Sequence, residues 1–241
     1  MLRFILFWML AGGALAIEPD WSDYNALLSA YVMPGTKDGL QANLVDYQSI
    51  AEDERFGRAI LGIQQFDVRL LETREETLAF YINAYNLLTI RLIIDHQPLD
   101  SIRDIGNFFR GPWDIVVLEN ADGRLTLDDI EHQIIRGFAE PRIHFAVNCA
   151  SLSCPDLRLE AYQAAKLDAQ LEEQTQHFLT QSKGLQTRDS LIRVSRIFDW
   201  YEEDFESRGG VERFIRHYRP ELEFSEADAS LPYNWALNSK Q

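Results

Sequence analysis

The sequence predicts an α+β fold in which helices surround a small, mainly antiparallel sheet. Segments with helical and with strand-like hydrophobic patterns mix along the 241 residues without the regular strand–helix–strand spacing of a parallel sheet. Hydrophobic residues make up 46% of the chain, which is enough for a sizeable core. No low-complexity tract or linker interrupts the sequence after residue 16, so we expect one domain over residues 17–241.

The first sixteen residues have the pattern of a secretory signal peptide. Arg3 precedes an apolar run at residues 4–15, and Ala14-Leu15-Ala16 fits the small-x-small cleavage pattern. The run is too short to cross a bilayer comfortably, so we expect a cleaved, periplasmic or secreted protein without stable membrane insertion. An uncleaved membrane anchor is the alternative. The formal net charge of −15 argues against a nucleic-acid partner and leaves a peptide or small-molecule ligand.

In the first half of the chain, apolar residues at helical spacing predict helices at residues 21–31, 54–63, 66–71 and 74–96. Residues 34–39 are expected to be a loop, and residues 43–50 a short strand followed by a turn. The helix at 74–96 is apolar nearly all round, so it should lie in the middle of the fold. Asn83 and Asn86 share one face of it, and their amides need either loop backbone or a ligand as partner.

In the second half, strands and helices alternate irregularly. We expect strands at residues 113–118, 143–148 and 191–194, a second short strand ending at Leu125, and helices at 126–137, 161–181 and 211–218. Residues 197–205 form an aromatic-rich segment.

Glu131 is the most unusual residue of the helix predicted at 126–137. It lies close to the middle of the apolar face, where an unpaired carboxylate would be costly, so it must be paired, hydrogen-bonded or protonated. His132 follows at the border of that face. These two residues predict a functional site that contains a carboxylate and an imidazole. The alternative is a structural glutamate paired with Arg142 or another buried cation.

The two cysteines, Cys149 and Cys154, lie in a loop of small residues after the strand predicted at 143–148. A nearby histidine could make Cys149 a nucleophile, with backbone N–H groups of the loop as an oxyanion hole. A local disulfide between the two is the competing interpretation, permitted by export. Metal binding by Glu131, His132, His144 and Cys149 is a third, but no known ligand spacing supports it, and we expect no metal and no cofactor.

The predicted strand also bears on which histidine serves Cys149. In an extended strand, His144 and Cys149 would lie roughly 16 Å apart, so His144 would be a poor base for the thiol. His132 is then the best placed candidate.

Six segments together resemble the domain-of-unknown-function family 547 and cover most of the chain after residue 16. They are residues 79–86 (AFYINAYN), 125–136 (LTLDDIEHQIIR), 141–149 (PRIHFAVNC), 154–155 (CP), 197–205 (IFDWYEEDF) and 233–238 (YNWALN). The resemblance implies a fold distantly similar to papain-like and transglutaminase-like thiol hydrolases, which favours Cys149, His132 and Glu131 as site residues. Other residues replace Cys154 in plant-type members, which weakens the disulfide interpretation. In papain-like enzymes the cysteine precedes the histidine, so a shared mechanism would need a rearranged topology, or the similarity is only architectural.

We therefore expect an exported protein in which Cys149 carries out acyl transfer or the hydrolysis of an amide or thioester. His132 would be the base, and Glu131 would orient the imidazole or the substrate. The binding residues would be Asn83, Asn86, Arg142, His144, Trp200 and Tyr201. The alternative is a non-catalytic module that binds a peptide or a small thiol such as glutathione in the same pocket.

Overall fold

The long helix α4 (Arg74–His96) lies at the centre of the main hydrophobic core, as its apolar pattern predicts. The structure, a computed structural model, describes residues 19–107, 109–120, 123–188 and 191–240, so the predicted signal peptide lies outside the described residues. The helix begins at a capping box, in which Thr73 and Glu76 each accept a hydrogen bond from the other's backbone N–H. It is long and apolar enough to cross a membrane, but most of it is buried inside the protein, as in the core helix of a soluble fold.

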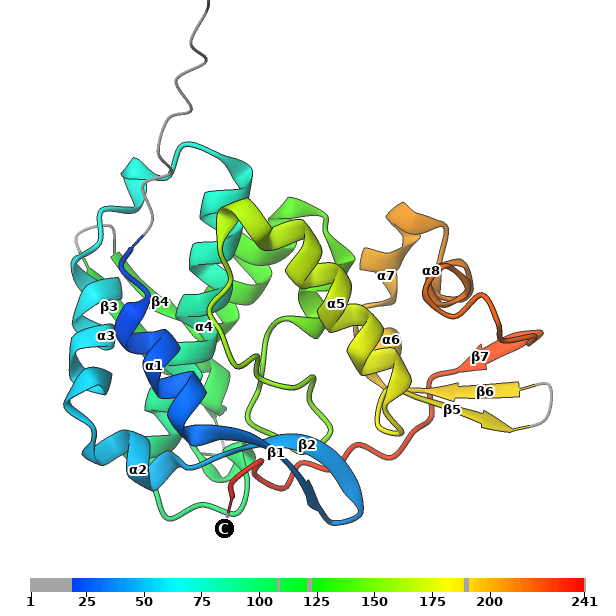
Figure 1. Cartoon of the computed structure of the whole chain (residues 1–241), viewed down its shortest axis with the longest axis horizontal. Coiled ribbons are helices and arrows are strands. Elements are labelled where there is room, and N and C mark those ends of the chain that lie inside the picture. The colour runs from blue at the N-terminus through cyan, green and yellow to red at the C-terminus, as the bar shows by residue number, and fades with distance from the viewer. Residues whose placement is uncertain (1–18, 108, 121–122, 189–190, 241) are drawn as a thin grey trace, which may run out of the picture.

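Three helices from the N-terminal part of the chain complete this core (Figure 1). They are α1 (Ser22–Tyr31), α2 (Tyr47–Glu52) and α3 (Glu54–Gln65); α2 and α3 contact α4, and α1 packs on α2 and α3. The predicted helix at residues 66–71 is only a single 3₁₀ turn, Val68–Leu70.

The strands form three small sheets among the described residues rather than a single sheet. Strands β1 (Val32–Lys37) and β2 (Leu40–Val45) form an antiparallel hairpin, and β3 (Val116–Asn120) pairs with β4 (Gly123–Thr126) in the same way. In the third sheet, β6 (Leu191–Val194) pairs antiparallel with β5 (Leu185–Arg188) and parallel with β7 (Glu226–Asp228). The loop expected at 34–39 is therefore part of a hairpin, which turns at Asp38 and Gly39, both with positive φ. The α+β class is confirmed.

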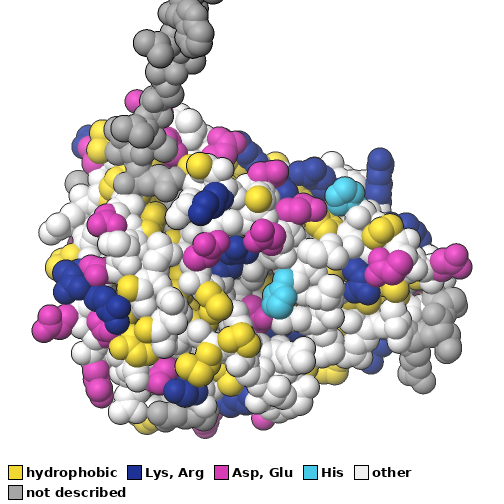
Figure 2. Space-filling model, viewed as in Figure 1, with side chains coloured by type: hydrophobic (Ala, Val, Ile, Leu, Met, Phe, Trp, Pro, Cys, Tyr) yellow, Lys and Arg dark blue, Asp and Glu magenta, His cyan; other side chains and the backbone are white. Residues whose placement is uncertain are grey.

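A second, smaller core is built around Phe145. Its ring contacts those of Phe178, Phe198, Phe205 and Phe214, with centroid distances of 5.2 to 6.2 Å. These rings come from the helices α5 (Leu167–Thr180), α6 (Ile197–Trp200), α7 (Glu202–Phe205) and α8 (Val211–Tyr218). In Figure 1 this part, with the third sheet, lies on the opposite side of α5 from α1 and α3. On the face shown in Figure 2, acidic and basic side chains are interspersed, without one large patch of either sign.

The predicted strand at residues 143–148 is wrong. These residues belong to a 3₁₀ helix, Pro141–Phe145, and the loop after it. Pro141 occupies the first turn, and the Glu140 side chain caps it by accepting a hydrogen bond from the Arg142 N–H. A short apolar run fits a buried helical turn as well as a strand. Because a 3₁₀ helix rises only about 2.0 Å per residue, the argument that separated His144 from Cys149 fails.

The predicted helix at residues 126–137 has an unusual form. After two α-helical residues, 127 and 128, it continues as a π-helix, Asp129–Ile135, and ends in a 3₁₀ turn, Arg136–Phe138. Short π-helical segments are frequent at functional sites. This one carries Glu131 on its buried side.

Candidate functional site

Cys149 opens into a cavity of about 100 Å³ with a mostly aromatic lining. The lining side chains are Tyr85, Trp113, Glu131, His144, Val147, Cys149, Cys154, Pro155, Ile197, Trp200, Tyr201, Tyr233 and Trp235. They come from α4, the 3₁₀ turn Pro112–Asp114, the π-helix, the 3₁₀ helix Pro141–Phe145, the loop that holds both cysteines, α6 and the residue after it, and the C-terminal segment. The cavity thus gathers residues that are far apart in the sequence.

The loop that carries Cys149 is held on one side by Asn148. The Asn148 side chain accepts a hydrogen bond from Ala150 N–H at 3.0 Å and donates one to the Pro155 carbonyl at 2.7 Å. Ala150 has a φ of 62°, in the left-handed region that alanine rarely adopts. Such a conformation persists only where surrounding bonds determine it.

The C-terminal segment holds the same loop from the other side. Leu152 N–H donates to the Ala236 carbonyl at 2.8 Å, and Asn238 N–H donates to the Ala150 carbonyl at 2.9 Å. This pairing brings Tyr233 to the thiol, with its hydroxyl 3.4 Å from Cys149 Sγ.

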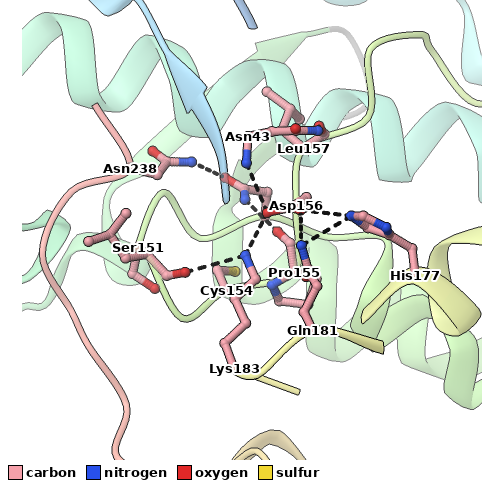
Figure 3. Close-up of polar contacts among 12 residues, drawn as sticks. Asn43, Ser151, Cys154, Pro155, Asp156, Leu157, His177, Gln181, Lys183 and Asn238 are labelled. Carbon is pink, nitrogen blue, oxygen red and sulfur yellow. Dashed lines mark hydrogen bonds and ion pairs between the residues drawn. The ribbon is translucent and has the colours of Figure 1, made fainter. Parts of the chain in front are cut away.

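Behind Cys154, the chain is anchored by the buried carboxylate of Asp156 (Figure 3). Its Oδ1 accepts hydrogen bonds from Lys183 Nζ at 2.5 Å and Asn43 N–H at 3.1 Å, and its Oδ2 from His177 Nε2 at 2.9 Å and Gln181 Nε2 at 2.6 Å. Burial alone would raise the pKa of Asp156, but the bond from His177 and the charge of Lys183 lower it to about 2. The cysteine loop is therefore fixed at its base by a buried ion pair.

The two cysteines are free and differ in acidity. A hydrogen bond from the Cys154 thiol, with smaller contributions from Ser151 and Tyr233, outweighs burial and lowers the pKa of Cys149 to about 7. Burial raises the pKa of Cys154 well above its usual range, and its sulfur accepts the Cys149 N–H at 2.8 Å. Cys149 is the thiol that can become a nucleophile near neutral pH.

Replacing Cys154 with Ala should therefore make Cys149 less acidic. The rate of Cys149 alkylation by iodoacetamide rises with pH through the thiol pKa. In the Ala variant, the midpoint of this pH profile should move from about 7 toward the usual value of about 8.5. Ser is the matched control, because its hydroxyl can still donate. A midpoint that stays near 7 in the Ala variant would contradict this account.

His144 is the histidine of the cavity. Its side chain is buried, and its ring lies 3.9 Å from the Tyr201 ring in a stacked arrangement. Nε2 lies 2.7 Å from Asp204 Oδ2, and Nδ1 has no hydrogen-bond partner among the described residues. Because an ionised carboxylate only accepts, Nε2 carries the proton and Nδ1 is the nitrogen that remains for chemistry.

Asp204 is itself held by Arg136. The guanidinium donates two hydrogen bonds to the carboxylate, at 2.7 and 2.8 Å. Burial would raise the pKa of Asp204, but the bonds from His144 and Arg136 lower it well below its usual range. Asp204 is thus a carboxylate that orients the His144 ring.

Glu131 has the partner that its burial requires, although not the one expected. Its Oε1 accepts a hydrogen bond from the Tyr201 hydroxyl at 2.5 Å. Burial and the Glu131 charge raise the pKa of Tyr201 far above its usual range, so Tyr201 is a neutral donor. Arg142, the expected counter-ion, instead pairs with Glu140 and Asp168 at 2.8 Å and lines a separate cavity of about 360 Å³.

The structure does not bring His132 to Cys149. Its side chain is exposed, with Nδ1 2.9 Å from Arg136 and Nε2 3.5 Å from Asp128. Its ring lies 6.2 Å from that of Tyr201, but His132 is not among the residues that line the cavity. Of the two histidines, His144 is the one that lines the cavity with Cys149.

The amides of Asn83 and Asn86 bind loop backbone rather than the cavity. Asn83 exchanges two hydrogen bonds of 2.8 Å with the backbone of Tyr162. Asn86 donates to the Ala146 carbonyl at 3.0 Å and accepts from the Asn148 N–H at 2.8 Å. Trp200 and Tyr201, by contrast, line the cavity as expected.

Sequence reasoning missed the roles of Asp204, Tyr233, Trp113 and Trp235. Asp204, Tyr233 and Trp235 lie in the segments 197–205 and 233–238, which were recognised as motifs without a function for these side chains. Within the described ranges, no three His, Cys, Asp or Glu side chains are grouped as a metal site requires.

Residues 68–179 match the model of a family described as protein of unknown function, DUF547. The matched range contains Glu131, His144 and Cys149, whereas Asp204 and Tyr233 lie beyond it. No curated protein and no solved structure matches the chain.

Proposed function

Because the description of the DUF547 family, whose model residues 68–179 match, names no activity, we propose a function from the site itself. Cys149 is a nucleophile that takes an acyl group from an amide or a thioester, and the protein is a cysteine-dependent hydrolase or acyltransferase. The signal-like pattern of residues 1–16 supports an activity outside the cytoplasm.

One observation carries the proposal. A thiol with a lowered pKa and a buried histidine with an unpartnered Nδ1 line the same cavity, and the other nitrogen of that histidine is bound to a carboxylate. Nucleophile, base and orienting acid are the three parts of a covalent acyl-transfer site. Cys149, His144 and Asp204 supply one each.

In this mechanism, His144 Nδ1 accepts the Cys149 proton and the sulfur attacks the carbonyl carbon of the substrate. When the C–N or C–S bond of the substrate breaks, Nδ1–H returns the proton to the leaving amine or thiolate. Water, or an acceptor amine or thiol, then gives its proton to Nδ1 and attacks the acyl-cysteine. The C–S bond to Cys149 breaks, Nδ1–H returns the proton to the sulfur, and the acyl product leaves.

Two hydroxyl groups beside the sulfur are suited to stabilise the negative oxygen of the intermediate. Ser151 Oγ and Tyr233 OH lie 3.2 and 3.4 Å from Cys149 Sγ. Burial raises the pKa of Tyr233, which keeps it a neutral donor. The Cys149 N–H is already bound to Cys154 Sγ, so side chains take the part that the sequence argument gave to backbone groups.

Incubation with p-nitrophenyl acetate tests the proposal. We expect mass spectrometry of the intact protein to find one acetyl group, mapped to Cys149, and p-nitrophenol release to continue past one equivalent. Cys149→Ala should abolish both, whereas Cys154→Ala should keep them. Acetylation confined to lysines would exclude the proposal. Alkylation of Cys149 without any acyl transfer would favour the non-catalytic binding module.

A further inference from the structure

The cavity beside Cys149 combines aromatic walls with one buried carboxylate. Trp200, Tyr233 and Trp235 form a continuous wall, with ring centroids 4.6 to 5.7 Å apart. Tyr201 and Trp113 add further aromatic surface. Aromatic faces carry negative electrostatic potential, so such a wall attracts cations.

The carboxylate is Glu131, and the hydrogen bond found for it goes to one of its two oxygens. Oε1 accepts a hydrogen bond from the Tyr201 hydroxyl, and the carboxylate lines the cavity. The residue is only 5% exposed. A buried carboxylate favours a positive partner.

The protein does not supply that partner inside the cavity. Neither lysine nor arginine is among its lining residues in the described ranges. Arg136 and Arg103 lie over the rings of Tyr201 and Trp235, at 5.4 and 5.2 Å, but neither lines the cavity. No lysine or arginine of the described residues thus reaches Glu131 inside the cavity, which leaves space there for a positive group of a ligand.

We propose that the acyl substrate of Cys149 carries an ammonium group, which Glu131 and the aromatic wall bind beside the thiol. This rests on the proposed function, which it extends by naming the substrate class. A cavity of about 100 Å³ holds roughly the volume of three water molecules, which suits the ammonium end of a side chain rather than a whole ligand.

Three small alkylating reagents of different charge test the inference without knowledge of the natural substrate. They are (2-bromoethyl)trimethylammonium, iodoacetamide and iodoacetate, each measured at Cys149 by peptide mass and normalised to its rate with N-acetylcysteine. We expect the cationic reagent to be favoured over the anionic one in the wild-type protein. Glu131→Gln should lower this preference by roughly tenfold.

Two further variants separate local recognition from other effects. Glu203→Gln removes the same charge from an exposed position, and it should leave the preference within about twofold of wild type. Trp200→Leu replaces an aromatic ring that is 42% exposed, and it should lower the preference without unfolding the protein.

The results that would overturn the inference are specific. The inference is wrong if the wild-type protein has the same ratio of cationic to anionic alkylation rates as N-acetylcysteine. It is also wrong if Glu131→Gln changes all three rates by the same factor. If acyl transfer from p-nitrophenyl acetate fails while the cation preference persists, the proposed function is wrong and the cation site stands. If acyl transfer succeeds without the preference, only the substrate class is wrong. If Cys149 reacts with none of the reagents, both are wrong.

Discussion

Replacing Lys183 with Met is expected to lower the free energy of unfolding by about 3–5 kcal/mol. The Lys183 side chain is 1% exposed and its partner Asp156 is 4% exposed, with Nζ and Oδ1 2.5 Å apart. Removing the ammonium leaves the Asp156 carboxylate buried without its cation, beneath the cysteine loop. Burying a charge without a partner is among the most destabilising single changes.

Urea unfolding of the two proteins measures this difference, with Arg58→Met as the matched control. Arg58 pairs with Asp23 on the surface, where the side chains are 55% and 30% exposed, so its loss should cost about 1 kcal/mol or less. Since the folded pKa of Asp156 lies below the unfolded value of about 3.9, the Lys183 contribution is present above that pH and lost as pH falls toward 2. Equal losses in both variants would show that the buried pair does not anchor the loop.

Replacing His144 with Ala is expected to lower acyl transfer from p-nitrophenyl acetate by about 10²–10⁴-fold. The imidazole is the only group in the cavity that has an unpartnered ring nitrogen and a carboxylate orienting the other nitrogen. Without it, the described part of the cavity has no imidazole to move protons between Cys149 and the leaving group. The steady-state rate of p-nitrophenol release measures the effect, and urea unfolding confirms that the variant is folded.

The parts of the fold that sequence could predict are those determined by local pattern. Helix α4 was predicted with its bounds because its 23 residues have a continuous apolar pattern, and the structure adds a Thr73–Glu76 capping box at its start. Helix α8 and strand β6 were also predicted with their bounds. The three small sheets were less predictable, since pairing such as that of β6 with β7 joins segments some thirty residues apart.

The site was predictable where a charged residue lies on an otherwise apolar face. Glu131 on an apolar face had to have a buried partner, and it does. Which partner could not be predicted, because Tyr201 lies 70 residues away and only the packed fold brings it near.

The sequence argument preferred His132 to His144 because of one secondary-structure assignment that the structure contradicts. Residues 143–148 have alternating apolar side chains, but Pro141, the Glu140 cap and the Asn86 amide together stabilise a helical turn and a loop instead. The distance argument against His144 depended entirely on an extended chain. Asp204 and Tyr233 carry no local signal, since their roles arise from contacts across 60 and 84 residues.

The most direct test of the central claim compares His144→Ala with His132→Ala in the same acyl-transfer assay. The two substitutions are chemically identical and lie twelve positions apart, but only His144 lines the cavity that contains Cys149. We predict a loss of about 10²–10⁴-fold for His144→Ala and a rate within about twofold of wild type for His132→Ala. A rate that survives in His144→Ala, or that falls as far in His132→Ala, would contradict the assignment of Cys149, His144 and Asp204.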